Sequence, residues 1–302
     1  MKCINPITVN GHLYNCGHCV NCRVNYTQMW ALRLIYELST TNKACFVTLT
    51  YSEDKRPGQL VKKDLQDFFK RLRQNYKREY HEFGEKLRYY AVGEYGSRTK
   101  REHYHAIIFG LDNFSDKDRN ILRKSWPFCE HWLFDKERGR KSAMQEVTPD
   151  DIQYVTGYVQ KKLNGQMAKE EYGEKQSPFS LCSQGLGLDF ALKNKERLIK
   201  NGYTYFKGHK VSIPRYFCEK FGVKKSDLID FENKNTLEEF EKSGDIIFKY
   251  FKEDMQRKNC WYPKNSGLMK RLFEYWYDDR RFALSQRVYE DFKQRQKMRG
   301  IL

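Results

Sequence analysis

The segment at residues 103–109, His-Tyr-His-Ala-Ile-Ile-Phe, constrains the fold of this chain more than any other. Two histidines around a bulky residue, followed by an unbroken apolar run, are typical of a buried β-strand. Because side chains alternate between the two faces of a strand, His103 and His105 point to the same side. Paired histidines are often ordinary polar strand residues, but two adjacent imidazoles can also bind a divalent metal. The segment therefore predicts a strand that carries a candidate metal site.

A carboxylate is expected to complete this site. Residues 87–92 predict a second strand, and Glu94 follows it. If the two strands pair as a hairpin, Glu94 lies near His103 and His105, whereas Glu102 alternates to the opposite face. Two imidazoles and one carboxylate leave coordination positions open for water or phosphate oxygens, as Mg²⁺ or Mn²⁺ chemistry requires. The three side chains are therefore predicted to bind one of these ions.

Two tyrosines lie four residues apart on a helix that is predicted to start at Thr148. Tyr154 and Tyr158 share one face of this helix. A phenol can attack a phosphodiester and form a phosphotyrosine once its proton is lost or screened. Lys161 and Lys162 follow within one turn and are candidates to support the phosphate or to lower the pKa of a tyrosine. Tyrosines at helical spacing are usually core residues, so this hypothesis depends on the metal site.

The N-terminal region is rich in cysteine, with Cys-Gly-His-Cys-Val-Asn-Cys at residues 16–22. Tetrahedral Zn²⁺ bound by Cys3, Cys16, Cys19 and Cys22 is the preferred interpretation. His12 or His18 in place of Cys3, an iron–sulfur cluster, and free thiols without metal are the alternatives. This crowding favours a metal site in a reducing compartment over disulfides. Five further cysteines are expected to be isolated core residues: Cys45, Cys129, Cys182, Cys218 and Cys260.

The composition favours a nucleic-acid partner. The 302 residues carry a net charge of +17, and 15% of them are aromatic. Lysine and arginine neutralise phosphates, while aromatic rings stack on unpaired bases. A merely basic protein has the same charge, so position matters, and the loop beside the histidine strand is the better candidate for DNA contacts through Arg98, Lys100 and Arg101. No apolar run of about 18 residues exists, so no membrane-spanning helix is expected.

Strands and helices mix along the chain and indicate an α+β fold with a central antiparallel sheet and flanking helices. The predicted organisation is a cysteine-rich metal-binding element at residues 1–23, a main domain at 24–218, and a mostly helical, basic and aromatic region at 219–302. Within the main domain, strands are expected near 45–51, 87–92 and 103–109.

Four stretches and the cysteine cluster together resemble one family. The stretches are Phe-Val-Thr-Leu-Thr-Tyr at 46–51, Gly-Glu-Tyr-Gly at 93–96 followed by His-Tyr-His-Ala-Ile-Ile-Phe-Gly at 103–110, Tyr-x-x-x-Tyr-x-x-Lys-Lys at 154–162, and Ile-Pro-Arg-Tyr at 213–216. In this order they are similar to the HUH endonucleases with a ferredoxin-like sheet, and within them to the rolling-circle replication initiators of the microviruses, in the gokushovirus branch. The resemblance covers about residues 1–218. Tyr104 is more polar than the usual middle residue of the histidine motif.

The resemblance implies an enzyme that nicks single-stranded or supercoiled duplex phage DNA at the origin. Tyr154 or Tyr158 would attack, leaving a 3′-hydroxyl as primer and a 5′-phosphotyrosine, and the second tyrosine would act after one round so that the displaced strand is resealed. Host helicase and polymerase would be partners, and the cytoplasm of the infected bacterium would be the location. A non-catalytic zinc-containing nucleic-acid-binding protein and a related HUH relaxase or transposase remain the alternatives.

Overall fold

The computed structural model describes residues 3, 5–9, 12–81, 84, 86–96, 99–130, 132, 142–161, 170–206, 209–224, 228 and 246–257. The chain divides into two compact units. The first, here called the cysteine unit, comprises Met1–Val24, Arg197–Tyr205 and Ser212–Leu302. The second, here called the sheet unit, comprises Asn25–Glu196 and Phe206–Val211. The predicted division at residues 23 and 218 stays a prediction.

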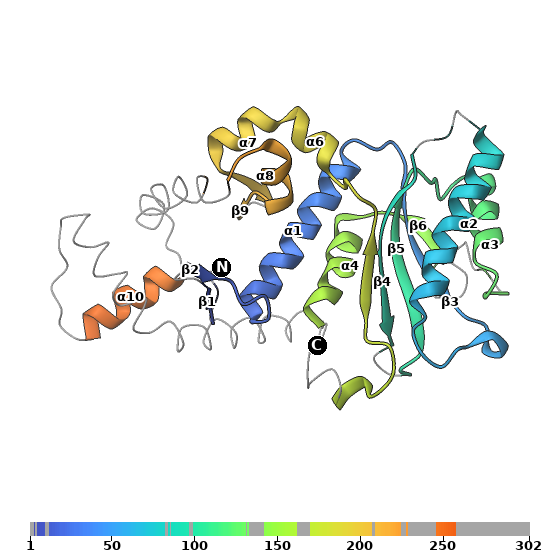
Figure 1. Ribbon diagram of the computed structural model, residues 1–302, viewed down its shortest axis with the longest axis horizontal. Helices are drawn as coiled ribbons and strands as arrows, with labels where there is room; N and C mark the ends of the chain where they lie inside the picture. Colours follow the sequence, from blue (N-terminus) through green and yellow to red (C-terminus); the bar gives the residue numbers. More distant parts are fainter. Residues whose placement is uncertain are drawn as a thin grey trace. The chain divides into compact units, whose positions relative to one another are not determined.

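The sheet unit is built on five strands. These are β3 (Ala44–Thr50), β4 (Arg88–Tyr95), β5 (Glu102–Phe109), β6 (Met144–Glu146) and β7 (Phe179–Cys182). Their order across the sheet is β6-β3-β5-β4-β7, and every neighbouring pair is antiparallel (Figure 1). The predicted α+β fold with a central antiparallel sheet is therefore confirmed, and the histidine strand β5 is its central strand.

The helices are α1 (Val20–Leu38), α2 (Lys62–Tyr80), α3 (Asp116–Ser125), α4 (Pro149–Lys161), α6 (Leu188–Lys193), α7 (Lys195–Asn201), α8 (Arg215–Phe221) and α10 (Ile246–Arg257), with a 3-10 turn η1 (Glu53–Lys55). Two hairpins complete the described structure: β1 (Ile7–Val9) with β2 (His12–Tyr14), and β8 (Tyr203–Phe206) with β9 (His209–Ser212). Among the described residues, every helix is too short or too polar to cross a lipid bilayer.

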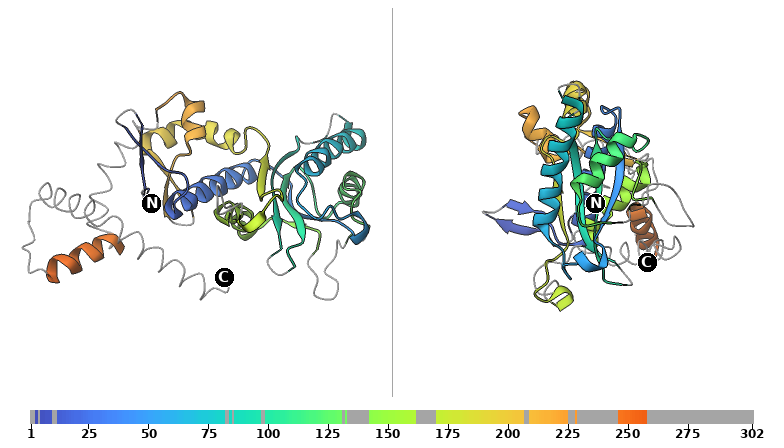
Figure 2. Two further views of the ribbon diagram at one scale, coloured as in Figure 1. Left: turned by 60° about the horizontal axis from the view of Figure 1, so that its bottom comes forward. Right: turned by 90° about the vertical axis from the view of Figure 1, so that its right-hand side faces the viewer.

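Two apolar layers cover the two faces of the sheet (Figures 1 and 2). On one face, Tyr104, Ala106 and Ile108 of β5 belong to a core with residues of α2 and α3. On the other face, Ile107 and Phe109 of the same strand belong to a core with residues of α1 and α4. Side-chain alternation along β5 thus feeds both layers. Because His103 and His105 have odd numbers, they share the face that carries α1 and α4.

Local sequence explains where the helices of the sheet unit begin. At α4, the backbone N–H of Asp151 donates to the Thr148 hydroxyl (3.2 Å), and the Thr148 N–H donates to the Asp151 carboxylate (2.9 Å). This reciprocal cap satisfies two backbone donors that the first turn leaves open, and the predicted helix start is confirmed. At α3, the Ser115 hydroxyl accepts from the N–H of Asp118 in the same way (3.3 Å).

The structure departs from the predicted elements in three places. Helix α1 begins at Val20 instead of residue 24, so Cys22 lies inside a helix. The single helix expected near 188–200 is two helices that meet at Asn194. Strands β1, β2, β6 and β7 were not predicted, because three or four residues are too few to display an alternating pattern.

A buried carboxylate fastens the turn after β7 to the rest of the sheet unit. The Glu37 carboxylate on α1 accepts a hydrogen bond from the N–H of Gly187 (2.7 Å) and forms an ion pair with Arg88 on β4 (3.0 Å). The Arg33 guanidinium donates to the carbonyl of Leu186 (3.2 Å). This turn therefore depends on a backbone that approaches α1 closely.

We expect the two glycines of this turn to respond differently to alanine. Both have a positive φ, +79° at Gly185 and +75° at Gly187, so alanine is strained at either position. An added Cβ at 187 also meets the carbonyl oxygen of Arg33 at 2.5 Å, whereas at 185 its nearest neighbour is 3.9 Å away. G185A should cost about 1 kcal/mol from strain, and G187A about 2–4 kcal/mol because overpacking adds to it. Urea unfolding of both variants tests this, and equal losses would contradict it.

Candidate active site and cysteine cluster

The hairpin of β4 and β5 brings the predicted metal-binding residues together. Glu94 lies directly opposite His103, and Val92 lies opposite His105. One ligand atom from each of Glu94, His103 and His105 falls within 4.8 Å of the others. The predicted pairing of the two strands is therefore confirmed, and Glu102 lies on the opposite face, where its buried carboxylate pairs with Arg56 (3.3 Å).

Both imidazoles direct Nε2 toward the same carboxylate oxygen. Oε1 of Glu94 lies 2.8 Å from Nε2 of His103 and 3.2 Å from Nε2 of His105. Burial acts to raise the pKa of the Glu94 carboxyl, but hydrogen bonds from the two histidines outweigh it and lower this pKa to about 2. Burial acts to lower the pKa of His103, but the hydrogen bond to Glu94 outweighs it and raises this pKa. The site thus concentrates negative charge against two imidazoles.

The far side of each ring is also occupied. Nδ1 of His105 lies 3.1 Å from the Thr48 hydroxyl, and Nδ1 of His103 lies 3.1 Å from the carbonyl oxygen of Arg101. Thr48 reaches His105 because the two residues are direct partners in the β3–β5 ladder. The ring of Phe46 stacks on His105 with centroids 5.3 Å apart. Sequence reasoning assigned no role to Phe46 or Thr48, although alternation along β3 puts both on the histidine face.

The donor atoms of this group fit a divalent cation. Two imidazole nitrogens and a carboxylate oxygen already face one another, held by the paired strands of the sheet. Nitrogen and oxygen donors without any thiolate suit Mg²⁺ or Mn²⁺, which keep further positions for water or phosphate. The mutual approach of Glu94, His103 and His105 is therefore the arrangement that a bound cation needs.

Helix α4 places both tyrosines against the same histidine. The ring of Tyr154 lies 5.4 Å from that of His105, and the ring of Tyr158 lies 6.0 Å from it in a stacked arrangement. The two tyrosine rings are 4.8 Å apart. Ile152 and Val155, on another side of the helix, are buried in the core beneath the sheet. Packing of one helix face thus directs the tyrosine face toward the site.

The two phenols differ in exposure. Tyr154 is 49% exposed, whereas Tyr158 is partly buried. Burial raises the pKa of the Tyr154 phenol, and a hydrogen bond with Tyr158 partly opposes this. Burial also raises the pKa of Tyr158, with its hydrogen bond to Tyr154 and the nearby Glu94 charge acting in the same direction. Both phenols therefore hold their protons firmly at neutral pH.

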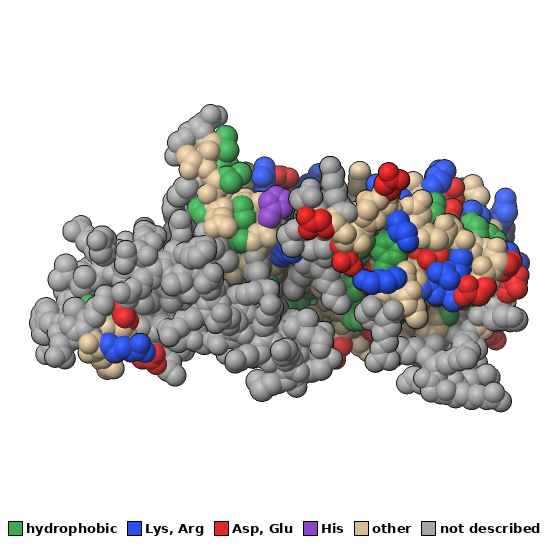
Figure 3. Space-filling view, turned by 90° about the horizontal axis from the view of Figure 1, so that it is seen from below, with side chains coloured by type: hydrophobic (Ala, Val, Ile, Leu, Met, Phe, Trp, Pro, Cys, Tyr) green, Lys and Arg blue, Asp and Glu red, His purple; other side chains and the backbone are tan. Residues whose placement is uncertain are grey.

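The predicted cationic residues lie partly outside the described structure. Arg98, Lys162 and the side chain of Lys161 belong to the part of the chain that is not described. Lys100 pairs with Glu171 (2.7 Å), and Arg101 donates to Glu53 (2.5 Å) and to the carbonyl of Tyr51 (2.6 Å). On the face seen in Figure 3, lysine and arginine side chains alternate with aspartate and glutamate over the described surface. Arg101 thus also holds its own loop in place.

Comparisons with known proteins follow the same residues. Residues 44–163, from β3 to just beyond α4, match the family model of the replication-associated protein ORF2. The chain is 30% identical over 220 residues to replication-associated protein ORF2 of Spiroplasma virus 4, covering 67% of this chain and 65% of that protein. It is 27% identical over 214 residues to replication-associated protein ORF4 of Chlamydia phage 1 (67% and 52%). The third relative, replication-associated protein VP4 of Bdellovibrio phage phiMH2K, is 28% identical over 211 residues (68% and 66%).

The chain is a homologue of the microvirus replication-associated proteins. The resemblance seen in the sequence is therefore confirmed. The chain spans about half to two thirds of the length of the curated relatives it matches. The matched family segment contains Glu94, both histidines and both tyrosines. No solved structure matches the chain.

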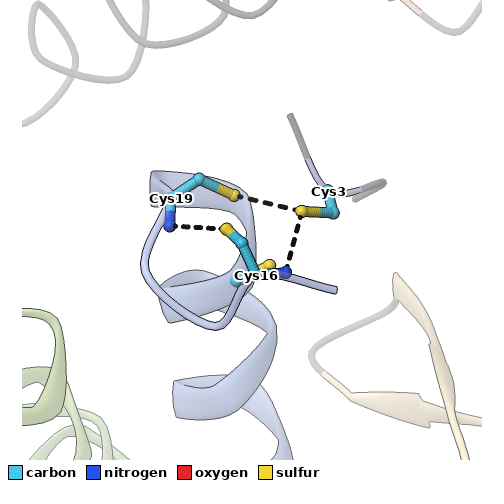
Figure 4. Close-up of side chains that lie close together, drawn as sticks. Cys3, Cys16 and Cys19 are labelled. Carbon is cyan, nitrogen blue, oxygen red and sulfur yellow. Dashed lines mark hydrogen bonds between the residues drawn. The ribbon is translucent and has the colours of Figure 1, made fainter. Parts of the chain in front are cut away.

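The cysteine cluster of this microvirus homologue lies outside the matched family segment. The sulfur atoms of Cys3, Cys16, Cys19 and Cys22 all lie within 4.8 Å of one another. Sγ of Cys3 is 3.9 Å from Sγ of Cys19 (Figure 4). Burial raises the pKa of the Cys3 and Cys22 thiols, so thiolates here need a compensating cation. Four converging sulfurs are the donor set that a tetrahedral metal ion takes.

Backbone N–H groups are already directed at these sulfurs. The N–H groups of His18 and Cys19 point at Sγ of Cys16 (3.5 and 3.3 Å), and the N–H of Cys16 points at Sγ of Cys3 (3.2 Å). The turn that allows this passes through Gly17 with φ +75°. N–H donors stabilise the negative charge of thiolates, so the loop is arranged for deprotonated cysteines. Cys22 joins them from the first turn of α1.

The remaining cysteines follow the prediction only in part. Cys45 and Cys218 are buried, as expected of core cysteines, and Cys129 is partly buried. Cys182 is exposed, so its predicted burial was wrong. It occupies the last position of the edge strand β7, where only one neighbouring strand covers it. Cys260 lies outside the described residues.

Proposed function

We propose that this chain is a metal-dependent, site-specific DNA endonuclease and strand transferase that starts rolling-circle replication of a small single-stranded DNA phage. The observation that carries the proposal is the convergence of Glu94, His103 and His105 beneath Tyr154 and Tyr158. A cation site beside two phenols is what phosphodiester cleavage by tyrosine requires. The replication-associated names of the relatives support the same process.

Glu94, His103 and His105 would hold Mg²⁺ or Mn²⁺ at this site. The ion, when bound, supplies polarisation of the scissile phosphate and steadies the leaving oxygen. The histidines act as ligands and not as acid–base groups, because each Nε2 faces the shared carboxylate while each Nδ1 is already engaged.

The tyrosines carry the covalent chemistry. The phenolic oxygen of Tyr154 or Tyr158 attacks phosphorus and displaces the 3′-oxygen of the preceding nucleotide, which takes a proton and becomes a 3′-hydroxyl. The phosphate remains as a 5′-phosphotyrosine. Since burial raises the pKa of both phenols, loss of the phenol proton needs nearby positive charge, and Lys161 and Lys162 follow in the sequence to supply it.

Two tyrosines against one histidine allow the reaction to be repeated. After one round of synthesis, the second tyrosine attacks the regenerated origin and releases a new 3′-hydroxyl. That hydroxyl attacks the first phosphotyrosine, closes the displaced strand into a circle and returns the first phenol. The two ring centroids lie 5.4 and 6.0 Å from that of His105, so both phenols can reach the same phosphate.

The substrate in this proposal is phage DNA at the origin, as a single strand and as supercoiled duplex. Arg98, Lys100 and Arg101 would contact its phosphates from the loop between β4 and β5. The exposed 3′-hydroxyl would serve a host polymerase, and a host helicase would open the duplex ahead of it. These partners place the activity in the cytoplasm of the infected bacterium.

We also propose that the cysteine cluster binds structural Zn²⁺. Four cysteines leave no position for a substrate, which is typical of structural zinc sites. The N–H groups directed at Cys16 and Cys3 support thiolates before any metal arrives. The ion would hold residue 3 and the 16–22 segment together at the start of α1.

Replacing both tyrosines should abolish nicking. We expect Y154F with Y158F to lower nicking of the supercoiled DNA of the encoding phage at least about 10³-fold and to remove the covalent adduct, because no phenolic oxygen remains. Y26F, at an exposed tyrosine of α1, should nick as the wild type does. Gel assays with Mn²⁺ and mass spectrometry of the adduct peptide provide the measurement. DNA binding without any nick by the wild type would instead favour the non-catalytic nucleic-acid-binding protein.

Removing one loop cation should weaken DNA binding. Lys100 is 67% exposed and its ion pair with Glu171 is a surface pair, which contributes little to stability and can exchange for a phosphate. K100A should lower single-stranded DNA affinity and reduce the salt slope by about 0.7. The matched control is K117A, since Lys117 is 68% exposed and pairs with Glu79 on α2. Fluorescence anisotropy at several salt concentrations decides, and equal slopes for both variants would contradict the role.

Zinc content should depend on the cluster cysteines alone. We expect one zinc per wild-type chain by elemental analysis, and a fall to near zero in C19S, because a tetrahedral site that loses a thiolate binds zinc far more weakly. C182S, at an exposed cysteine outside the cluster, should keep the full amount. Visible absorbance with iron in place of zinc would overturn the assignment.

A further inference from the structure

We propose that Thr48 is a positioning residue that sets the orientation and protonation of His105 and thereby the affinity of the site for its cation. The inference rests on the proposed metal-dependent function and deepens it. It starts from one contact, the 3.1 Å approach of the Thr48 hydroxyl to Nδ1 of His105.

A neutral imidazole carries one proton, and the nitrogen without it is the one that binds a metal. For both histidines the binding nitrogen is Nε2, because this atom faces Glu94 in each ring. The proton must then reside on Nδ1 of His103 and of His105. What lies beside each Nδ1 therefore decides how readily the ring takes the binding form.

The two histidines obtain this partner in different ways. His103 has the carbonyl oxygen of Arg101, which only accepts hydrogen bonds, so Nδ1 of His103 is protonated whenever this contact exists. The same carbonyl accepts from the N–H of Gly96 (2.8 Å), and the Arg101 guanidinium is fixed by Tyr51 and Glu53. The partner of His103 is thus backbone, and a loop holds it.

The partner of His105 is a side chain that both donates and accepts. When Nε2 of His105 donates to Glu94, the Thr48 hydroxyl donates to the unprotonated Nδ1. When Nε2 binds a cation, Nδ1–H donates to Thr48 instead, because the hydroxyl rotates. The ring therefore keeps a hydrogen bond at Nδ1 in both forms, and the change to the binding form needs no movement of heavy atoms.

The backbone fixes Thr48 for this task. It lies directly opposite His105 in the β3–β5 ladder, and its own N–H donates to the carbonyl of Ala143 (2.9 Å). The ring of Phe46 stacks on His105 from the same strand. Thr50 has the same relation to His103 that Thr48 has to His105, but His103 already has the Arg101 carbonyl. The inference therefore predicts that only one of the two threonines matters.

The test compares Mn²⁺ binding by the full chain, loaded with zinc beforehand, in four forms. Electron paramagnetic resonance of free Mn²⁺ gives the affinity of wild type, T48V, T48S and T50V. Valine keeps the shape of threonine and the strand preference but has no hydroxyl. T48V should bind Mn²⁺ about 10–100-fold more weakly, as loss of such outer partners does elsewhere. T48S should restore affinity to within a few fold, and T50V should match the wild type.

A spectroscopic measurement separates positioning from loss of structure. In the Mg²⁺-loaded wild type, the Nδ1–H of His105 should give a ring N–H signal in NMR that is protected from exchange with water. T48V should lose this signal while that of His103 stays, and T48S should keep both.

The possible failures are distinguishable. Equal Mn²⁺ affinity of T48V and the wild type would overturn the inference about Thr48, and so would equal losses in T48V and T50V. A wild-type chain that binds Mn²⁺ with the expected order of variants but never nicks phage DNA would overturn the proposed function alone. A wild-type chain that binds no Mn²⁺ would overturn both.

Discussion

The two-residue alternation of β5 is the constraint on which the rest of the structure depends. This central strand gives Tyr104, Ala106 and Ile108 to one core, and its odd-numbered residues to the other face. A slip of one residue in its pairing would exchange the two faces, placing His105 in an apolar layer and an apolar side chain at the metal position. The free energy of burying both apolar layers therefore also fixes the register of Glu94 with His103.

Tyr104 shows how a polar atom is accommodated in that core. Its hydroxyl accepts from the N–H of Val61 (2.8 Å) and bonds to the Tyr51 hydroxyl (2.9 Å), so full burial leaves it satisfied. Its ring fits because Gly93 lies opposite, where an added Cβ would meet the ring at 3.1 Å. The residue between the two histidines thus anchors the loop before α2 to the strand that carries the site.

Sequence patterns predicted the features that depend on neighbours along the chain. The hairpin of β4 and β5 and the helix of Tyr154 and Tyr158 follow from local periodicity, and both are present. Thr48 lies 57 residues from His105, and its role depends on which strand pairs with β5, which periodicity does not reveal. The carbonyl of Arg101 is harder still, because every residue has one. Its side chain indicated DNA contact, while its backbone turned out to face His103.

The active-site geometry arises from two periods that meet on one face of the sheet. The strand period of two puts His103, His105 and Ile107 on that face, so that apolar and metal-binding positions share it. The helical repeat then lets α4 bury Ile152 and Val155 in the same layer while Tyr154 and Tyr158, four residues apart, extend along the strand toward His105. Because apolar packing sets the distance of α4 from β5, the tyrosine hydroxyls do not have to fix the helix and can serve the chemistry. The histidine rings, which must not move, are instead held at both nitrogens.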